Sequence, residues 1–153
     1  MEAKAGPALV PRTQEFLPLK VIIAGSRSVA RISARRWDYN RLAAILENAI
    51  TESRFEITEV ISGGAGGPDR AGEQWAARNE IPVTVIKPNW KLGRGAGLIA
   101  NRQLAEVGEA LIAIHDSEST GTADMIEHMK AAGMPVCVII ATPQPPLLRI
   151  FSV

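Results

Sequence analysis

Hydrophobic residues gather in five short continuous runs along this chain, and each gap between runs holds a longer stretch with helical spacing of its apolar residues. The runs lie at 19–24, 57–61, 83–86, 110–114 and 136–140. The helix-like stretches lie at 37–53, 68–79, 97–107 and 120–132. Continuous runs, unlike alternating ones, are typical of parallel strands covered on both faces. The pattern predicts an α/β fold: a doubly wound, mainly parallel, five-stranded Rossmann-like sheet with helices on both faces.

The two ends of the chain depart from this alternation. Residues 1–18 are rich in proline and small residues and are expected to form a flexible leader. Residues 142–153 form a Pro-rich tail, whose segment 147–151 is apolar enough to seek a partner surface. Residues 19–141 are expected to form the single folded domain.

Composition narrows the class of protein. Of the 153 residues, 46% are hydrophobic, which suffices for a core and excludes wholesale disorder. The 17 Lys and Arg residues are balanced by 16 Asp and Glu residues, so a nucleic-acid partner, which favours a basic excess, is not expected. The single cysteine forms no intramolecular disulfide, and the sequence has neither a signal-peptide pattern nor a membrane-spanning run. A cytoplasmic protein with no membrane attachment is expected.

Several kinds of chemistry lack their motifs. The two histidines, His115 and His128, are far apart and have no cysteine beside them, so no metal and no cofactor are expected. There is no Gly-x-Ser-x-Gly turn, no P-loop, and no Gly-x-Gly-x-x-Gly fingerprint followed by a strand-end acid.

Doubly wound sheets bind ligands beyond the carboxyl ends of their strands, which directs attention to the loops there. The first such loop offers Gly25, Ser26 and Arg27. Glycine admits close backbone approach, and arginine pairs in a forked geometry with phosphate or carboxylate. So short a motif is equally compatible with a turn that carries a surface arginine.

The second loop is rich in glycine and lies between a predicted strand and a predicted helix. Its candidate ligand-binding residues are Ser62, Gly63, Gly64, Ala65, Gly66 and Asp69. Exposed backbone N–H groups and a helix N-terminus in this setting form an anion cradle. Asp69 is expected either to hydrogen-bond a ribose hydroxyl or to act as a favourable charge in the first helical turn.

The third and fourth loops add further polar groups. Trp90 is expected either to stack on a base or to pack onto the core, and Asn101 and Arg102 begin the following helix. Gly121 and Thr122 open the last helix, where free N–H groups and a hydroxyl suit an anion. Ser119 or Thr120 is the expected N-cap of that helix.

Together these loops resemble the SLOG superfamily of Rossmann-like nucleotide-binding proteins, in particular its YspA, cpYpsA-related branch. The resemblance is carried by 25–27, by 62–70 with Trp75 and Ala76, by Asn101 and Arg102, and by Gly121 and Thr122. It implies that residues 19–141 form a SLOG-like domain that binds nucleotides or ADP-ribose-like molecules, often as a homo-oligomer. The ligand-facing positions that it implies are Gly25, Ser26, Arg27, Gly63, Gly64, Asp69, Asn101, Arg102, Gly121 and Thr122.

The enzymes of this superfamily to which the chain is more distantly similar, the Lonely Guy phosphoribohydrolases, carry Pro-Gly-Gly-x-Gly-Thr-x-x-Glu in their last loop. Here the glycine pair is missing and Met125 stands in place of the catalytic glutamate. Methionine neither moves a proton nor stabilises a cationic transition state. The sequence therefore favours binding over catalysis, with Asp69, Asp124 and Glu127 as the carboxylates available if the protein is an enzyme.

The leading hypothesis is a sensor or sequestering protein that holds a phosphorylated, nucleotide-derived small molecule. The alternatives are a phosphoribohydrolase or N-glycosidase acting on nucleotides, and a single-stranded nucleic-acid binder.

Overall fold

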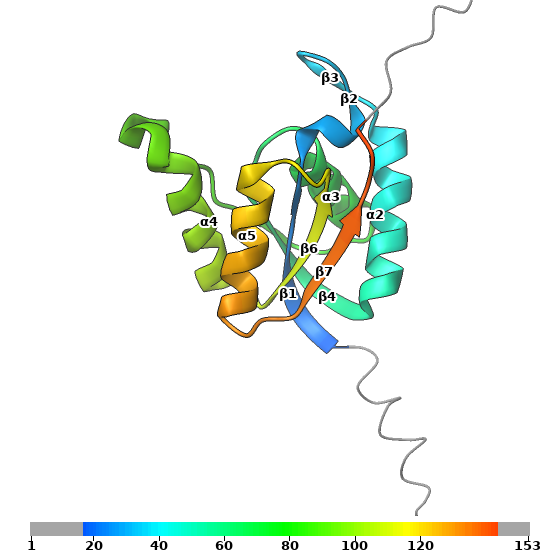
Figure 1. The fold of residues 1–153 in the computed structure, drawn as a ribbon. Coiled ribbons are helices and arrows are strands. Elements are labelled where there is room, and N and C mark those ends of the chain that lie inside the picture. Colours follow the sequence, from blue (N-terminus) through cyan, green and yellow to red (C-terminus); the bar gives the residue numbers. More distant parts are fainter. Residues whose placement is uncertain (1–16, 144–153) are drawn as a thin grey trace, which may run out of the picture.

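The computed structural model describes residues 17–143, and its centre is a parallel sheet with helices on either side (Figure 1). The elements, in chain order, are β1 (Leu17–Gly25), η1 (Arg27–Ala30), β2 (Arg31–Ser33), β3 (Arg36–Trp37), α2 (Tyr39–Ser53), β4 (Phe55–Ser62), α3 (Pro68–Arg78), β5 (Val83–Val85), η2 (Trp90–Gly95), α4 (Ala96–Val107), β6 (Ala110–His115), α5 (Thr120–Ala131) and β7 (Val136–Ile140). Nearly all of the predicted leader and tail, including the apolar segment 147–151, lies outside the described residues.

The strand order of the five-stranded sheet is β5-β4-β1-β6-β7, and every pair is parallel. The chain thus winds outward from β1 in one direction and then returns to start again beside it at β6. Strand order reverses between β1 and β6, which makes this the topological switch point where ligands bind in such sheets. The predicted fold class is confirmed.

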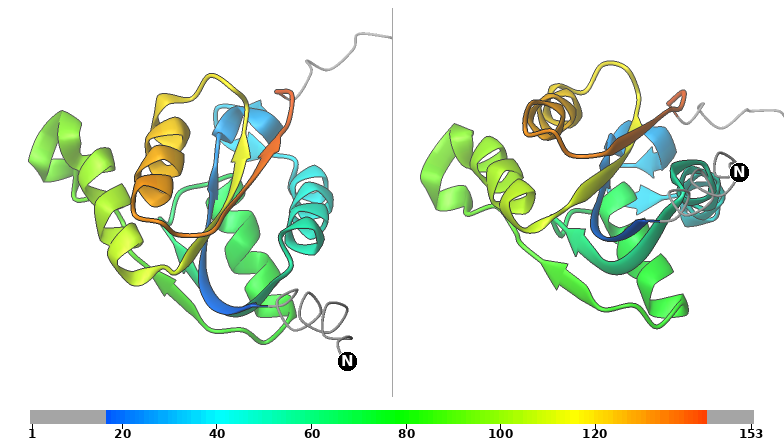
Figure 2. Two further views of the ribbon diagram at one scale, coloured as in Figure 1. Left: turned by 60° about the horizontal axis from the view of Figure 1, so that its bottom comes forward. Right: turned by 90° about the horizontal axis from the view of Figure 1, so that it is seen from below.

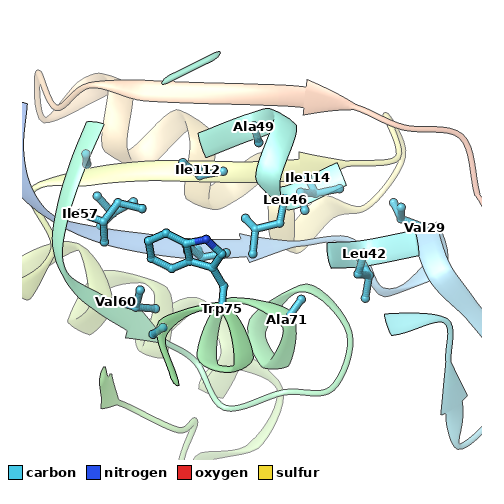
Figure 3. Close-up of a cluster of buried hydrophobic side chains, with 14 of the residues drawn as sticks. Val29, Leu42, Leu46, Ala49, Ile57, Val60, Ala71, Trp75, Ile112 and Ile114 are labelled. Atoms are coloured by element: carbon cyan, nitrogen blue, oxygen red, sulfur yellow. The ribbon is translucent and has the colours of Figure 1, made fainter. Parts of the chain in front are cut away.

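Two hydrophobic clusters hold the helices against the sheet, one on each face (Figure 2). On the first face, α2 and α3 pack over the sheet, and Figure 3 shows Trp75 of α3 in the same cluster as Leu46 and Ile112. On the second face, Met125 and Met129 of α5 pack with residues of the sheet and with α4.

The central strands explain the continuous apolar runs in the sequence. The side chains of β6 from Ala110 to Ile114 and of β1 from Val21 to Ile23 are fully buried, because helices cover both faces there. The edge strand β7 is only half-buried, and Cys137 on it contacts the carbonyl oxygen of Ala49. The two-faced burial inferred from the pattern therefore holds at the centre of the sheet and weakens at its edge.

The helical spacing predicts that this helix begins at Trp37, but α2 begins at Tyr39. The Asp38 carboxylate accepts a hydrogen bond from the Arg41 backbone N–H at 3.0 Å and caps the helix. Trp37 instead belongs to the antiparallel β2–β3 hairpin, which the sequence pattern did not predict.

Helix α5 has a side-chain cap at its start and a backbone motif at its end. Ser119, one of the two predicted caps, accepts a hydrogen bond from the Thr122 backbone N–H at 3.4 Å. At the other end Gly133 adopts a φ of 76°, and the Met134 N–H donates to the Met129 carbonyl at 3.0 Å. This is a Schellman motif, with glycine in the left-handed conformation it favours.

Candidate functional site

A cavity of about 570 Å³ opens at the carboxyl ends of the strands, beside the switch point between β1 and β6. Its volume falls in the range of small-molecule and cofactor sites. It is lined by Ala24, Gly25, Arg27, Gly63, Gly64, Ala65, Gly66, Asp69, Lys87, Pro88, Trp90, Gly97, Ala100, Asn101, Leu104, Ser119, Gly121, Thr122 and Met125.

Most residues singled out from the sequence meet on the walls of this cavity. Those that line it are Gly25, Arg27, Gly63, Gly64, Ala65, Gly66, Asp69, Trp90, Asn101, Gly121 and Thr122. Ser26, Ser62 and Arg102 do not line it. Ser26 and Ser62 face inward, with 2% and 0% of their surface exposed, whereas Arg102 faces solvent.

Gly25 ends β1 at a point where the chain passes very close to β6. A Cβ at this position would clash with the carbonyl oxygen of Ile114. The next residue, Ser26, donates its backbone N–H to that same carbonyl at 2.8 Å. Glycine is therefore required here by packing between strands, in addition to any role toward a ligand.

The Ser26 side chain joins the two loops at the switch point. Its hydroxyl oxygen accepts a hydrogen bond from the Asp116 backbone N–H at 3.1 Å and lies 3.2 Å from the Thr122 hydroxyl and 3.4 Å from His115 Nδ1. The hydroxyl of Thr122 also contacts that of Ser119 at 3.2 Å. Ser26 does not line the cavity itself, but its contacts position the start of α5, which does.

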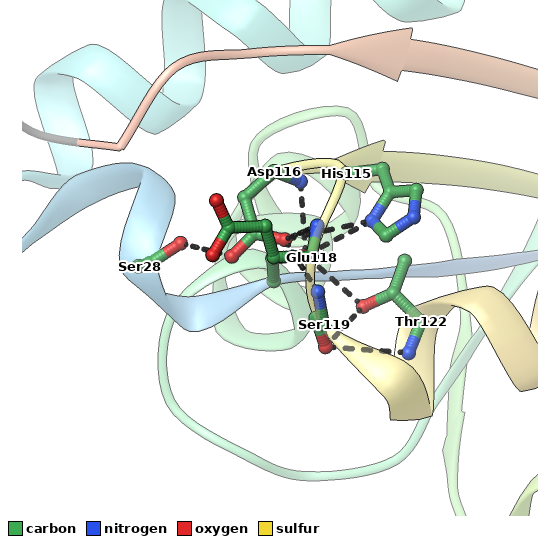
Figure 4. A network of polar contacts seen from close by, with 7 residues as sticks. Ser28, His115, Asp116, Glu118, Ser119 and Thr122 are labelled. Carbon is green, nitrogen blue, oxygen red and sulfur yellow. Dashed lines mark hydrogen bonds and ion pairs between the residues drawn. The ribbon is translucent and has the colours of Figure 1, made fainter.

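Asp116 anchors the same loop (Figure 4). Its carboxylate accepts hydrogen bonds from the Ser28 hydroxyl at 2.6 Å and from the backbone N–H groups of Glu118 and Ser119 at 2.8 and 2.7 Å. Burial of the Asp116 carboxyl group acts to raise its pKa, but these hydrogen bonds outweigh burial and hold the pKa well below its usual range.

Ser26, His115 and Asp116 do not form a catalytic relay. Both the Ser26 hydroxyl and the Asp116 carboxylate approach the same ring nitrogen, Nδ1 of His115, at 3.4 and 3.7 Å. A relay needs the nucleophile and the carboxylate on opposite ring nitrogens.

The glycine-rich loop between β4 and α3 is shaped by its surroundings. Gly64 and Gly67 have φ values of 77° and 81°, in the region that favours glycine. A Cβ on Gly66 would lie 2.7 Å from the ring of Trp37, so the β2–β3 hairpin presses directly on the loop. The Gly67 backbone N–H donates to the Tyr39 hydroxyl at 3.0 Å, and the Gly64 N–H donates to the Ser62 hydroxyl at 3.0 Å.

Asp69, in the first turn of α3, extends its carboxylate back under this loop. Its Oδ2 atom accepts a hydrogen bond from the Ala65 backbone N–H at 3.2 Å. The pKa of Asp69 is raised to about 7, chiefly by burial of the carboxyl group and also by the neighbouring Glu73 carboxylate. The N–H groups of Ala65 and Gly63 and the positive charge of Arg27 lower it, but they do not outweigh burial.

Glu73 is fixed beside Asp69 by its own contacts. The Ser62 hydroxyl donates to Glu73 Oε2 at 2.6 Å, and Arg70 Nε lies 3.6 Å from Oε1. Ser62, which the sequence suggested as a ligand contact, is thus committed to Glu73 and to the Gly64 N–H.

The loop after β5 brings aromatic and basic groups to the rim of the cavity. Trp90 is 69% exposed, so the alternative that it packs onto the core is wrong. Lys87 lines the cavity and lies over Gly64, where an added Cβ would meet its side chain at 2.8 Å. Lys87 comes two residues after the end of β5, so the strand-end rule that selected the other loops also pointed to it.

Asn101 joins α4 to α5 across the cavity. Its side-chain N–H₂ group donates to the Gly121 carbonyl at 3.2 Å and to Asp124 Oδ2 at 3.1 Å. Because both of these partners are acceptors, the Asn101 side-chain oxygen is left to accept a hydrogen bond from elsewhere. Met125 lines the cavity with 2% of its surface exposed, whereas Glu127 points to solvent.

In residues 17–143, no group of three or more His, Cys, Asp or Glu side chains is placed to hold a metal ion. No helix of the same residues combines the length and apolarity needed to cross a bilayer.

The parallel sheet and the glycine-lined cavity at its switch point place the chain in the class of Rossmann-like α/β proteins, in which ligands bind at that point. Within that class, residues 19–93 match the sequence model of the YspA, cpYpsA-related SLOG family. The match confirms the resemblance inferred from the loops and includes the first two of them, but it ends before Asn101 and Gly121. No curated protein and no solved structure matches the chain.

Proposed function

We propose that the cavity binds a phosphorylated nucleotide or a nucleotide-derived molecule such as ADP-ribose. The observation that carries this proposal is the meeting of three anion-attracting features at one cavity: the Arg27 side chain, the loop 63–66 and the first turn of α5. The Thr122 N–H of that turn donates to Ser119, whereas the N–H groups before it have no carbonyl partner within the helix and are available to an anion.

Other groups on the walls suit the remainder of such a ligand. Trp90 offers an exposed aromatic face for a base. The Asn101 side-chain oxygen suits a hydroxyl or amino donor. Lys87 adds a second positive charge on the rim, opposite in sign to a diphosphate.

Binding without turnover is the favoured mode. Met125 offers no group that moves a proton, at the position where the Lonely Guy enzymes carry their glutamate. We therefore propose a protein that senses or sequesters its ligand.

One observation favours a second candidate, a hydrolase acting on the N-glycosidic bond of a nucleotide. Asp69 lies in the cavity with a pKa of about 7, which is suited to general acid or base catalysis near neutral pH. Of the other two candidates, Asp124 is held by Asn101 and Glu127 is exposed, so Asp69 is the group on which a hydrolase would depend.

Mass spectrometry distinguishes the two modes. The protein is purified and denatured, and the released small molecules are identified, in parallel with protein incubated with nucleotides, NAD and ADP-ribose. We expect an intact nucleotide-type ligand recovered unchanged. Free base and ribose phosphate that accumulate with time, and fail to do so with Asp69→Asn, would identify an enzyme and contradict the assignment of Met125 as disabling.

A further inference from the structure

The Asp69 carboxylate occupies the place where the glycine-rich loop would hold an anion. Its Oδ2 atom accepts from the Ala65 N–H at 3.2 Å, and a Cβ on Gly63 would lie only 2.8 Å from the same atom. Since Gly63 and Ala65 both line the cavity, the Asp69 carboxylate lies at the cavity wall beside the backbone of both residues. An anionic ligand seated on the loop therefore meets the charge of Asp69 at close range.

The charged groups around Asp69 do not remove this conflict. On its own helix, Glu73 is held in place by Ser62 and Arg70 and adds a second negative charge. From η1, Arg27 supplies positive charge, and from the loop after β5, Lys87 reaches over Gly64.

From the remaining elements, Asp124 of α5 is tied to Asn101, and the hydroxyl of Tyr39 in α2 accepts from Gly67. His115, beyond Ser26, is the histidine of the polar network at the switch point. A bound diphosphate would draw on Arg27 and Lys87, the two cations that line the cavity, and leave Asp69 beside Glu73.

We propose that the cavity binds its anionic ligand together with one proton, which is held by the carboxyl group of Asp69. This inference rests on the proposed function and adds to it a regulation of the same site by pH. In the neutral form, Asp69 no longer repels the ligand, and its O–H becomes a donor that a phosphate or ribose oxygen accepts.

The direction of the pH dependence follows from linkage. In the protein without ligand, Asp69 has a pKa of about 7. A bound anion beside the carboxyl group would raise this pKa further. In the pH range between these two values, the complex holds a proton that the free protein has lost, so affinity falls as pH rises. The loss approaches about tenfold for each pH unit within that range.

Isothermal titration calorimetry with ADP-ribose tests the proposal. The diphosphate bridge of ADP-ribose keeps a constant charge between about pH 6 and about pH 9, unlike a terminal phosphate, whose second pKa is about 6. Titrations in two buffers of different ionisation enthalpy count the protons taken up on binding. We expect an uptake that approaches one proton per ligand at about pH 8, and a corresponding loss of affinity between about pH 7 and about pH 9.

The variant Asp69→Asn keeps a side-chain oxygen for the Ala65 N–H but carries no titrating group. It is expected to bind ADP-ribose with no proton uptake and with an affinity that is independent of pH. Glu127→Gln, at an exposed carboxylate outside the cavity, is the matched control and is expected to behave as the wild type.

The outcomes separate this inference from the proposed function. ADP-ribose binding by the wild type without proton uptake, or uptake that persists in Asp69→Asn, overturns the proton-coupled mechanism and leaves ligand binding intact. If neither ADP-ribose nor NAD binds at any pH, the proposed ligand class is wrong and the inference falls with it. If the Asp69→Asn protein fails to fold, the absence of proton uptake by the wild type still overturns the mechanism.

Discussion

Arg27 is the arginine that lines the candidate site. It begins the 3₁₀ turn η1, one residue after the end of β1, lines the cavity and acts electrostatically on Asp69. Its guanidinium group suits a phosphate because it donates several hydrogen bonds in one plane. If the cavity holds a phosphorylated ligand, Arg27 is expected to carry a large part of the affinity.

Replacing Arg27 with alanine is predicted to weaken ADP-ribose binding by about 1.5–3 kcal/mol, the range for a hydrogen bond to a charged group. Calorimetry at constant ionic strength measures the change. Arg36→Ala, an exposed arginine of the hairpin that does not line the cavity, serves as the control for a general loss of positive charge. Equal losses for both variants would show that Arg27 acts only through the overall electrostatic field.

Prediction of single site residues from the sequence fails at Ser26, Ser62 and Arg102, which do not line the cavity. The rule that ligands bind beyond the carboxyl ends of parallel strands suggested all three as site residues. In the structure, neighbours of these residues line the cavity, but the three residues themselves do not. The hydroxyls of Ser26 and Ser62 turn inward because their hydrogen-bond partners, Thr122 and Glu73, arrive from other parts of the chain. Such partners cannot be recognised from a loop motif, which shows composition and spacing only.

At the scale of elements, the parallel strands and four main helices were predictable because each has a strong apolar pattern. The β2–β3 hairpin was not, since strands of three and two residues are too short to show a period. Its importance comes from tertiary contact: Trp37 packs on Gly66, and the Arg31 guanidinium lies 5.1 Å from the Trp37 ring centre. Gly64 and Gly67 are therefore favoured by their backbone conformation, whereas Gly66 is required by its contact with Trp37. The sequence motif alone does not distinguish these two reasons for a glycine.

The N-cap of α5 allows a prediction at this scale. Ser119→Ala removes the acceptor for the Thr122 N–H and a contact to the Thr122 hydroxyl, and is expected to lower the free energy of unfolding by about 1 kcal/mol. Thr120→Ala, one residue along and exposed, is expected to change it much less. Chemical denaturation of both variants measures the difference, and equal losses would mean that the cap contributes nothing specific.

At the scale of the whole molecule, an apolar surface lies beside the mouth of the cavity. It is formed by three exposed side chains of η2 and α4: Leu92, Leu98 and Ile99. These elements project from the rest of the fold (Figures 1 and 2). Exposed apolar patches of this kind commonly mark interfaces, and a two-fold axis through the patch would set it against its own copy. We propose that the homo-oligomer expected from the family forms through this surface.

Leu92→Glu is accordingly predicted to shift the protein toward monomer by introducing a buried charge at the interface. Val107→Glu, at the far end of α4, adds the same charge outside the patch and is expected to leave assembly unchanged. Sedimentation velocity over a range of concentrations reports both. A wild type that is monomeric throughout that range would contradict the proposed oligomer.

The glycine-rich loop has a final consequence, for the kinetics of ligand capture. Its composition is that of a flexible segment, yet its amides are tied down one after another, by the Ser62 hydroxyl, the Asp69 carboxylate and the Tyr39 hydroxyl, while Trp37 braces Gly66. A site whose backbone is already ordered loses little conformational entropy when it is filled. If the cavity binds the proposed ligand, we expect capture at a rate set by diffusion and orientation, and not by a slower rearrangement of the loop into its bound conformation.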